Sequence, residues 1–525
     1  MIKLRRLLLP ISVPVILLAA VLLYARRDAR VQITQHRSIA RAPSISPDYS
    51  ATTIPPNIAP LNFVVQEAGS HYYVKVHSEQ GEPIEISSSS PKIIIPQSSW
   101  DRLLNMNKGG QLYFDIFVKS RDNQWIRFAP ITNTIAHEPI DGFLVYRKMR
   151  PLYSTYREMG IYQRNLHSYR ESLVLHGKSF GKGCVNCHTF LANKTNNMLM
   201  HIRASTGPSM LLIQNGRASN IDSRTQFGPP MGHPAWHPSG KLITFTIYNV
   251  RQFFHTTTRQ VRDVLDLDSA LGYYIPESKT LKTNPEISSK DRLETFPTWS
   301  PDGRYLYFCT APILWTDRTK FLPERYDQSK YDLVRISYNI ETDTWGELET
   351  VLSAEQTGLS IVQPRISPDG KFLLFCMCDY SGFPTFQPSS DLYLMDLSTG
   401  RYERLACNSD QSESWHSWSS NSRWIVFSSK RPTGLFSKAY FSYVDPNGSV
   451  HKPFVLPQKD PTFYDSFIKL YQMPELVTRP VPVTGEALAR LIRSSKQPTS
   501  VTPITAATPK APTLPPYGKP WQQLE

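Results

Sequence analysis

The chain consists largely of short apolar runs separated by turn residues. Between residues 57 and 150, runs such as "HYYVKVHS", "QLYFDIFVKS" and "GFLVYRKM" are rich in β-branched and aromatic residues. In "QLYFDIFVKS" both alternating sets of positions contain apolar residues, which is typical of a strand buried on both faces. Six or seven such runs in about 90 residues predict a small β-sandwich-like domain over 57–150.

A different composition follows over residues 151–196. The stretch "PLYSTYREMGIYQRNLHSYRESLVLHGK" contains many residues that favour helices, and it leads into "GKGCVNCHTF". We predict a short helical linker over 151–196 that contains this cysteine motif.

From residue 197 the sequence repeats. The stretches "PAWHPSGKLITFT", "PTWSPDGRYLYFCT", "PRISPDGKFLLFCM" and "HSWSSNSRWIVFSS" begin at Pro234, Pro297, Pro364 and His416. In Pro-Asp-Gly, proline presets φ and glycine accepts a positive φ, so each repeat contains a turn between two antiparallel strands. Recurring four-stranded units are typical of propeller blades, and we predict a β-propeller of five to seven blades over 197–478.

The two ends of the chain have their own character. An apolar run, Leu7–Tyr24, is flanked by basic residues and followed by no cleavage site, which predicts a signal-anchor or transmembrane segment over 1–27. Residues 28–56 are polar and then proline-bearing, as in a stalk. Residues 479–525 form a Pro/Thr-rich tail with too few apolar residues to order it. The predicted fold is therefore mainly β, with a membrane anchor in front.

The net charge of the chain indicates which class of binding partner it favours. The formal net charge is +14, which favours acidic proteins or anionic lipid surfaces. No run of Lys and Arg interleaved with aromatic residues occurs and no recognition-helix pattern is present, so we expect no nucleic-acid partner.

The motif "CVNCH" has the spacing of a covalent haem site. In C-x-x-C-H, two thiols bond to the haem vinyl groups and the adjacent histidine binds the iron. This predicts one haem c held by Cys184 and Cys187, with His188 as the proximal iron ligand. A structural zinc would need further ligands, and no second C-x-x-C exists. A redox dithiol would need a βαβ context, whereas a simple disulfide stays open on spacing alone.

Other residues could complete such a site. His201 and Met200 are the candidates for the distal iron ligand, and neighbours in a strand point to opposite faces, so at most one of them faces the haem. His237 and His416 stand at altered positions of the first and last repeats, which suggests a second site at one mouth of the propeller. Cys309 and Cys376 occupy the same repeat position, which favours buried packing over pairing.

These motifs resemble known proteins. The pattern P-x-W-S-P-D-G-[KR]-x-[LI]-x-F resembles the repeat of TolB-like (PD40) β-propellers. The whole chain resembles bacterial exported proteins that join such a propeller to a c-type cytochrome haem motif, on "MGIYQRN", "GCVNCHTF", "AWHPSGK", "SPDGRYLYF", "HSWSSNSRWIVFSS" and "KPFVLPQKDPTFY". The resemblance implies a histidine at His201, which places it ahead of Met200.

Together these features favour one function over two others. The first is a monohaem c-type cytochrome anchored in the bacterial cytoplasmic (inner) membrane, with its globular part in the periplasm. It would act in electron transfer or redox sensing, while its TolB-like propeller binds an acidic protein or redox partner. The alternatives are an interaction scaffold with a structural haem, and a haem enzyme with an open iron site. No G-x-S-x-G motif is present, so we assign no catalytic residues.

Overall fold

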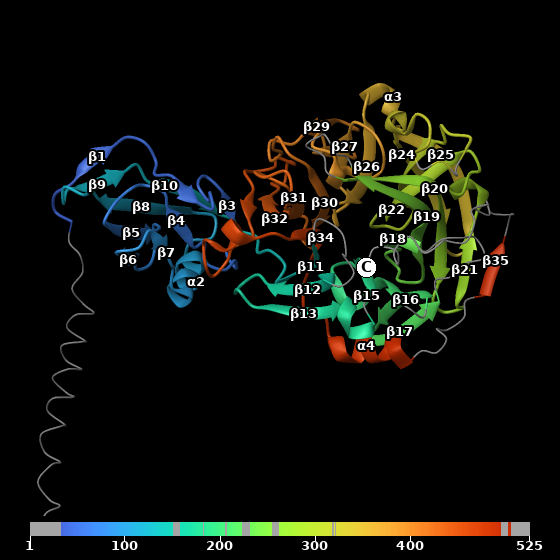
Figure 1. The fold of residues 1–525 in the computed structure, drawn as a ribbon, viewed down its shortest axis with the longest axis horizontal. Coiled ribbons are helices and arrows are strands. Elements are labelled where there is room, and N and C mark those ends of the chain that lie inside the picture. The colour runs from blue at the N-terminus through green and yellow to red at the C-terminus, as the bar shows by residue number, and fades with distance from the viewer. Residues whose placement is uncertain are drawn as a thin grey trace, which may run out of the picture.

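Six sheets, each built on four antiparallel strands, surround a common axis and form the larger part of the molecule (Figure 1). The structure is a computed structural model, and it describes residues 33–150, 158–181, 183–204, 207–222, 231–254, 262–317, 320, 322–494 and 502–505. The predicted anchor over 1–27 lies outside the described residues. None of the described helices is long and apolar enough to cross a membrane.

The first blade combines strands from two distant parts of the chain. It consists, from the axis outward, of β34 (Leu470–Val477), β11 (Phe143–Met149), β12 (Gly160–Asn165) and β13 (Glu171–His176). The C-terminal strand β34 pairs antiparallel with β11, so this blade joins the beginning of the propeller to its end. The propeller therefore starts at β11 and includes strands that precede residue 197.

The other five blades follow in chain order. Blade 2 consists of β14 (Cys184–Leu191), β15 (Lys194–Ala204), β16 (Gly207–Gln214) and β17 (Arg217–Asp222). Blade 3 consists of β18 (Met231–Trp236), β19 (Ile243–Phe254), β20 (Arg262–Ile275) and β21 (Thr280–Thr283), to which β35 (Thr502–Thr505) adds in parallel. Blade 4 consists of β22 (Arg292–Trp299), β23 (Tyr305–Pro312), β24 (Asp332–Asn339) and β25 (Thr344–Leu352). Blade 5 consists of β26 (Ser360–Ile366), β27 (Phe372–Cys378), β28 (Asp391–Asp396) and β29 (Tyr402–Arg404). Blade 6 consists of β30 (Glu413–Trp418), β31 (Trp424–Ser429), β32 (Lys438–Tyr443) and β33 (Phe454–Val455).

The repeated turns join the first two strands of blades 3 to 6, as predicted. Gly240, Gly303 and Gly370 have φ of 72°, 74° and 74°, and Ser422 takes the same left-handed conformation in the last repeat. The phenylalanines that follow each turn are buried between blades: Phe245, Phe308, Phe375 and Phe427. Six blades fall within the predicted range, and the fold is a β-propeller.

The N-terminal domain is a two-sheet structure with a helix in its core. Its larger sheet is mixed and contains β1 (Arg37–Ile39), β3 (Thr53–Ile54), β5 (His71–His77), β6 (Ile84–Ser88), β8 (Gln111–Lys119), β9 (Trp125–Phe128) and β10 (Ile131–Ile135). The smaller sheet contains β2 (Ile45–Ser46), β4 (Phe63–Val65) and β7 (Lys92–Ile93). The helix α2 (Gln97–Met106) buries Trp100, Leu103 and Leu104. This helix was not predicted.

Two predicted boundaries of this domain are wrong. The expected stalk over 28–56 contributes three strands, because β1 pairs in parallel with β9 and β3 in parallel with β10. At the other end, β11 belongs to the propeller and not to the predicted domain over 57–150. Backbone pairing with distant strands decides both boundaries, and local composition does not show it.

The predicted helical linker over 151–196 is also wrong in its described residues. They form β12, β13, the single-turn 3₁₀ helix η2 (Gly177–Phe180) and the strand β14. The helix propensity of this stretch is overridden by the inter-strand hydrogen bonds of blades 1 and 2.

The predicted tail over 479–525 is partly ordered. The helix α4 (Gly485–Ser494) buries Leu488, Ala489 and Ile492 against blades 1 and 2. Residues 506–525 lie outside the described part of the chain. The remaining short helices are α3 (Ala354–Thr357), η3 (Pro285–Ile287), η4 (Tyr326–Gln328), η5 (Pro384–Phe386) and η6 (Phe463–Ser466).

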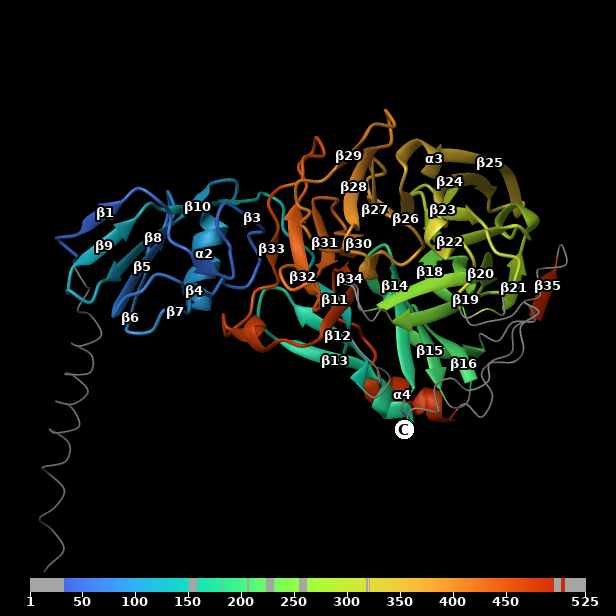
Figure 2. The same cartoon turned by 45° about the horizontal axis from the view of Figure 1, so that its top comes forward.

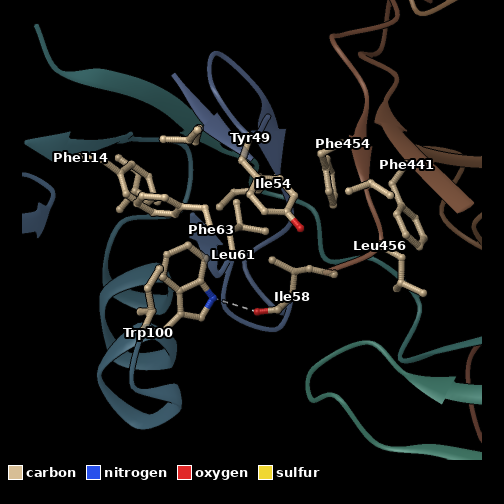
Figure 3. Close-up of a cluster of buried hydrophobic side chains, with 14 of the residues drawn as sticks. Tyr49, Ile54, Ile58, Leu61, Phe63, Trp100, Phe114, Phe441, Phe454 and Leu456 are labelled. Atoms are coloured by element: carbon tan, nitrogen blue, oxygen red, sulfur yellow. Dashed lines mark hydrogen bonds between the residues drawn. The ribbon is translucent and has the colours of Figure 1, made fainter. Parts of the chain in front are cut away.

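The N-terminal domain lies beside blade 6 (Figure 2), and buried side chains of the two belong to one hydrophobic core. Figure 3 shows Ile54 and Ile58 of the domain facing Phe454 and Leu456 of the propeller. The Trp100 indole N–H donates a hydrogen bond of 2.9 Å to the Ile58 carbonyl and closes the domain side of this core. Continuous apolar burial across the junction indicates that the two parts form one structural unit.

Candidate functional site

The cysteine motif lies on β14, the innermost strand of blade 2. In the pairing of β14 with β15, Val185 stands opposite Ile202 and His188 opposite Met200. The two residues between, Asn186 and Cys187, together oppose His201, which is a β-bulge. The motif is therefore built into the wall of the propeller axis.

The same bulge recurs on the innermost strand of every blade. The corresponding residue pairs in the other blades are His233-Pro234, Phe296-Pro297, Gln363-Pro364, Trp415-His416 and Met473-Pro474. Proline lacks an N–H group and is tolerated at a bulge because the ladder is interrupted there. Cys187 takes the place of this proline in blade 2, and His416 takes it in blade 6.

Both cysteines of the motif are buried free thiols. Cys184 is 4% exposed and Cys187 is 2% exposed, and they form no disulfide with each other. The Cys184 thiol lies 3.5 Å from the Met159 sulfur. Burial raises the pKa of both thiols, and the positive charges of Arg203 and Arg147 oppose this effect. The disulfide alternative is absent from this structure.

His188 is a buried imidazole whose ring nitrogens form no hydrogen bond of good geometry among the described residues, although the backbone groups of Val145 and Asn186 lie close enough to oppose the lowering of its pKa. It is 1% exposed, and neither ring nitrogen has a partner within the described residues. Burial, and then the charge of Arg147, lowers the pKa of His188 to about 3, so the ring is neutral. A neutral imidazole with two unsatisfied nitrogens costs folding free energy unless a ligand occupies it, and this is the protonation state that a metal requires.

His201 has the same unusual environment on the neighbouring strand. It is 1% exposed and both its nitrogens are unpaired among the described residues. Burial lowers its pKa well below the usual range. Met200 instead packs in the hydrophobic core between blades 1 and 2, beside Met198 and Ile202. The alternation of β15 therefore separates the two distal candidates. Because His188 and Met200 are partners in the β14–β15 register, they lie on the same face of blade 2, and His201 lies on the opposite face.

Next to the motif lies a buried arginine without an acidic partner. Arg147 is 8% exposed, and its guanidinium donates hydrogen bonds to the side-chain oxygens of Asn186 and Gln472, both neutral. Its Nε has no partner in the described structure. Burial lowers the pKa of Arg147, and the thiols of Cys187 and Cys184 are close enough to oppose this. A buried cation held only by amides is suited to receive an anion.

The axis beside His188 is open. A small cavity lies there, and its walls are the bulges of five blades together with His188. Most of this lining was not predicted, because it is divided among the bulges of different blades. A signal was available in the x-Pro dipeptide that opens the first three repeats, at Pro234, Pro297 and Pro364.

The second predicted pair of histidines is not brought together. His416 lines the cavity, and its Nε2–H donates to the Leu374 carbonyl at 3.1 Å. His237 lies in the turn of blade 3, where its Nε2–H donates to the Gly303 carbonyl at 3.0 Å. Its Nδ1 lies 2.7 Å from the Ser239 hydroxyl oxygen. Both rings are hydrogen-bonded structural groups in this structure.

The remaining cysteines are buried among apolar side chains. Cys309 and Cys376 are each 0% exposed and belong to the core between blades 4, 5 and 6, as predicted. Cys378 and Cys407 are in the same core. Across the described residues, no group of three or more His, Cys, Asp or Glu side chains has the arrangement of a metal site.

The residues present fit a haem c in their chemistry. The structure supplies two unpaired thiols, two histidines with four unpaired ring nitrogens, and a buried arginine able to pair with a haem carboxylate. A zinc ion would need at least one more ligand than this strand offers.

Comparisons with known proteins give similarity in fold only. No protein-family model matches the chain, and no curated protein matches it. Solved structures that match include a TolB-type protein from Agrobacterium tumefaciens, at 14% identity and a TM-score of 0.31 over 72% of this chain and all of that one. A chain of a nidogen/laminin complex matches at 8% identity and a TM-score of 0.36, over 65% of this chain and all of that one. An oligogalacturonate lyase from Vibrio parahaemolyticus matches at 12% identity and a TM-score of 0.34, over 73% of this chain and all of that one. The propeller assignment rests on the six sheets described above.

Proposed function

We propose that this protein is a binding propeller that carries one covalent haem c on the inner wall of blade 2 and acts in electron transfer or redox sensing. The observation that supports this best is His188, a buried neutral imidazole with no partner, in the same strand as two free thiols. Cys184 and Cys187 would form the thioethers, and His188 would bind the iron. When bound, the haem supplies a one-electron couple.

Each neighbouring residue has a distinct role in this proposal. His201 is the proposed distal ligand because its nitrogens are unpaired among the described residues, whereas Met200 packs in the core. His188 and His201 lie on opposite faces of the β14–β15 pair, so this proposal requires the bulge of β14 to rearrange when the haem is attached. Arg147 would pair with a haem carboxylate and so exchange two neutral hydrogen-bond acceptors for a charged one. Burial of the site would keep water from the iron and raise the reduction potential relative to an exposed haem.

The location and partner belong to the same proposal. The apolar run Leu7–Tyr24 would anchor the protein in the inner membrane, with the propeller in the periplasm, where haem c attachment takes place. The net charge of +14 favours an acidic protein as redox partner. A test of the anchor is cell fractionation: recovery of the whole population as soluble protein without its first residues would contradict it.

Haem staining of a denatured gel tests the attachment. We expect staining of the wild-type chain made together with haem-attachment machinery, and complete loss of staining in the Cys184→Ala/Cys187→Ala double variant. The matched control is Cys378→Ala/Cys407→Ala, which removes two other buried thiols and should leave staining intact. Wild-type protein without covalent haem would overturn the proposal.

A second candidate function is an interaction scaffold in which the haem is structural. The core shared by the N-terminal domain and blade 6 favours this candidate, because it fixes the domain and the propeller as one body. Reduction and oxidation of the haem distinguish the two. Affinity for a partner changes with redox state in the first case and stays constant in the second.

A further inference from the structure

The propeller axis contains hydrogen-bond donors that the fold leaves unused. Gln363 is 5% exposed, and its Nε2 has no partner in the described structure. The orientation of this amide is fixed, since its Oε1 accepts a hydrogen bond of 2.8 Å from the Trp415 backbone N–H. The Trp415 indole Nε1 is likewise buried and unpaired. Both residues line the cavity.

One arginine stands beside these donors. Arg365 of blade 5 and Glu475 of blade 1 form an ion pair of 3.3 Å across the axis, with 32% and 12% of their side chains exposed. A guanidinium has five N–H donors, and this single contact leaves most of them available. Arg365, Gln363 and Trp415 therefore offer N–H groups to the same small space.

The rest of the wall is aromatic. The rings of His233 and Phe296 stack with centroids 4.2 Å apart, and the Trp415 ring lies 5.9 Å and 6.2 Å from them. His233 is neutral, because burial lowers its pKa to about 3. The His233 ring is held between Tyr248 and Phe296, so a flat apolar body would pack against Phe296 and Trp415 while a charged end meets the N–H donors.

The backbone brings these side chains to the axis at a cost. His233, Phe296, Gln363, Trp415 and Met473 all have a left-handed backbone, with φ between 46° and 56°. Such conformations are unfavourable for residues other than glycine and are concentrated at ligand sites. Five of them at one level of the propeller direct their side chains toward the cavity.

From these observations we propose that the propeller axis binds a small organic carboxylate with a flat apolar body. Its carboxylate would be received by Arg365, Gln363 Nε2 and Trp415 Nε1, and its body would pack on Phe296 and Trp415. Glu475 would compete with the ligand for Arg365. His188 lines the same cavity, so this site adjoins the proposed haem, and a haem bound to His188 would compete with the ligand for the space at the axis.

Calorimetric titration of the full-length protein made without haem attachment, so that the axis beside His188 is free, tests the site with benzoate, and benzamide is the uncharged probe of the same shape. We expect saturable binding of benzoate and at least tenfold weaker binding of benzamide. Trp415→Phe keeps an aromatic ring at this position but removes the N–H donor, so benzoate should bind about tenfold more weakly. Arg365→Gln should abolish measurable binding, whereas Arg335→Gln, on an outer strand, should leave it unchanged.

A variant that should bind benzoate more tightly distinguishes loss of the site from misfolding of the protein. Glu475→Gln removes the competing carboxylate and frees Arg365, so benzoate should bind more tightly than to wild type. Equal affinity of wild type for benzoate and benzamide would overturn the proposal, as would weaker binding by Glu475→Gln in a protein with unchanged thermal unfolding. Haem staining is read separately, so failure of this site leaves the haem proposal standing.

Discussion

Two pairs of buried histidines in this propeller have opposite hydrogen-bonding states. His188 and His201 have four ring nitrogens without partners among the described residues. His237 and His416 are equally buried, yet each donates to a backbone carbonyl of a neighbouring turn or strand. Burial lowers the pKa of all four and therefore does not distinguish them. The distinguishing property is whether the protein itself satisfies the ring.

The first prediction, with the largest effect, concerns the haem spectrum. In haem-loaded protein, His201→Ala should convert a low-spin spectrum completely into a high-spin one that shifts with carbon monoxide. His416→Ala and His237→Ala should leave the spectrum unchanged, because their rings already have protein partners. The measurement is visible absorption of the oxidised and reduced forms. A His201→Ala protein that stays low-spin would remove His201 as the distal ligand.

The second prediction concerns the stability of the haem-free protein, in which we expect His237 to matter more than His188. In a Cys184→Ala/Cys187→Ala background, His237→Ala should lower the free energy of unfolding by about 2 kcal/mol, because it breaks two hydrogen bonds. His188→Leu should leave this free energy unchanged or raise it, since leucine removes two unsatisfied buried nitrogens. Urea unfolding measures both. Equal destabilisation by the two substitutions would show that His188 has partners in the haem-free protein.

The third prediction concerns how the free energy of unfolding depends on pH. Burial lowers the pKa of His416 to about 3, below the usual value near 6.5. The unfolded chain therefore binds the proton first, and this residue reduces stability as pH falls from about 6.5 to about 3. His416→Asn should make the dependence of unfolding free energy on pH shallower by up to about 1.4 kcal/mol per pH unit in that window. Urea midpoints at several pH values measure it, and an unchanged slope would contradict a neutral buried ring.

The repeats and the cysteine motif could be predicted from local sequence. The way in which the propeller closes could not. Pro-Asp-Gly and the phenylalanine that follows specify a hairpin within a few residues, so the strand pairs of blades 3 to 6 were correctly predicted. Blade 1 depends on pairing between β11 and β34, which are separated by the whole propeller. Its strands β12 and β13 have helical propensity, and only that long-range pairing makes them strands.

The candidate site divides in the same way. Cys184, Cys187 and His188 were identified by their spacing, because covalent haem attachment requires these residue types within one short segment. The roles of Arg147 and Gln363 could not be predicted, because each role depends on a hydrogen bond to a residue of another blade. His237 appeared as a site residue because it alters a repeat. The structure shows that the altered turn uses the imidazole to bind the next turn.

Because β34 completes blade 1 and closes the propeller, the propeller cannot close before β34 has been synthesised. The strand with the cysteine motif belongs to blade 2, whereas β34, which completes blade 1 beside it, follows every strand of blades 2 to 6 except the added strand β35. If the protein is exported as proposed, the motif would emerge while the wall next to it still lacks its innermost strand. A haem would then be attached to an open sheet and enclosed afterwards, when β34 pairs with β11. Under the proposed function, the C-terminal strand of blade 1 would therefore determine when the haem site becomes closed.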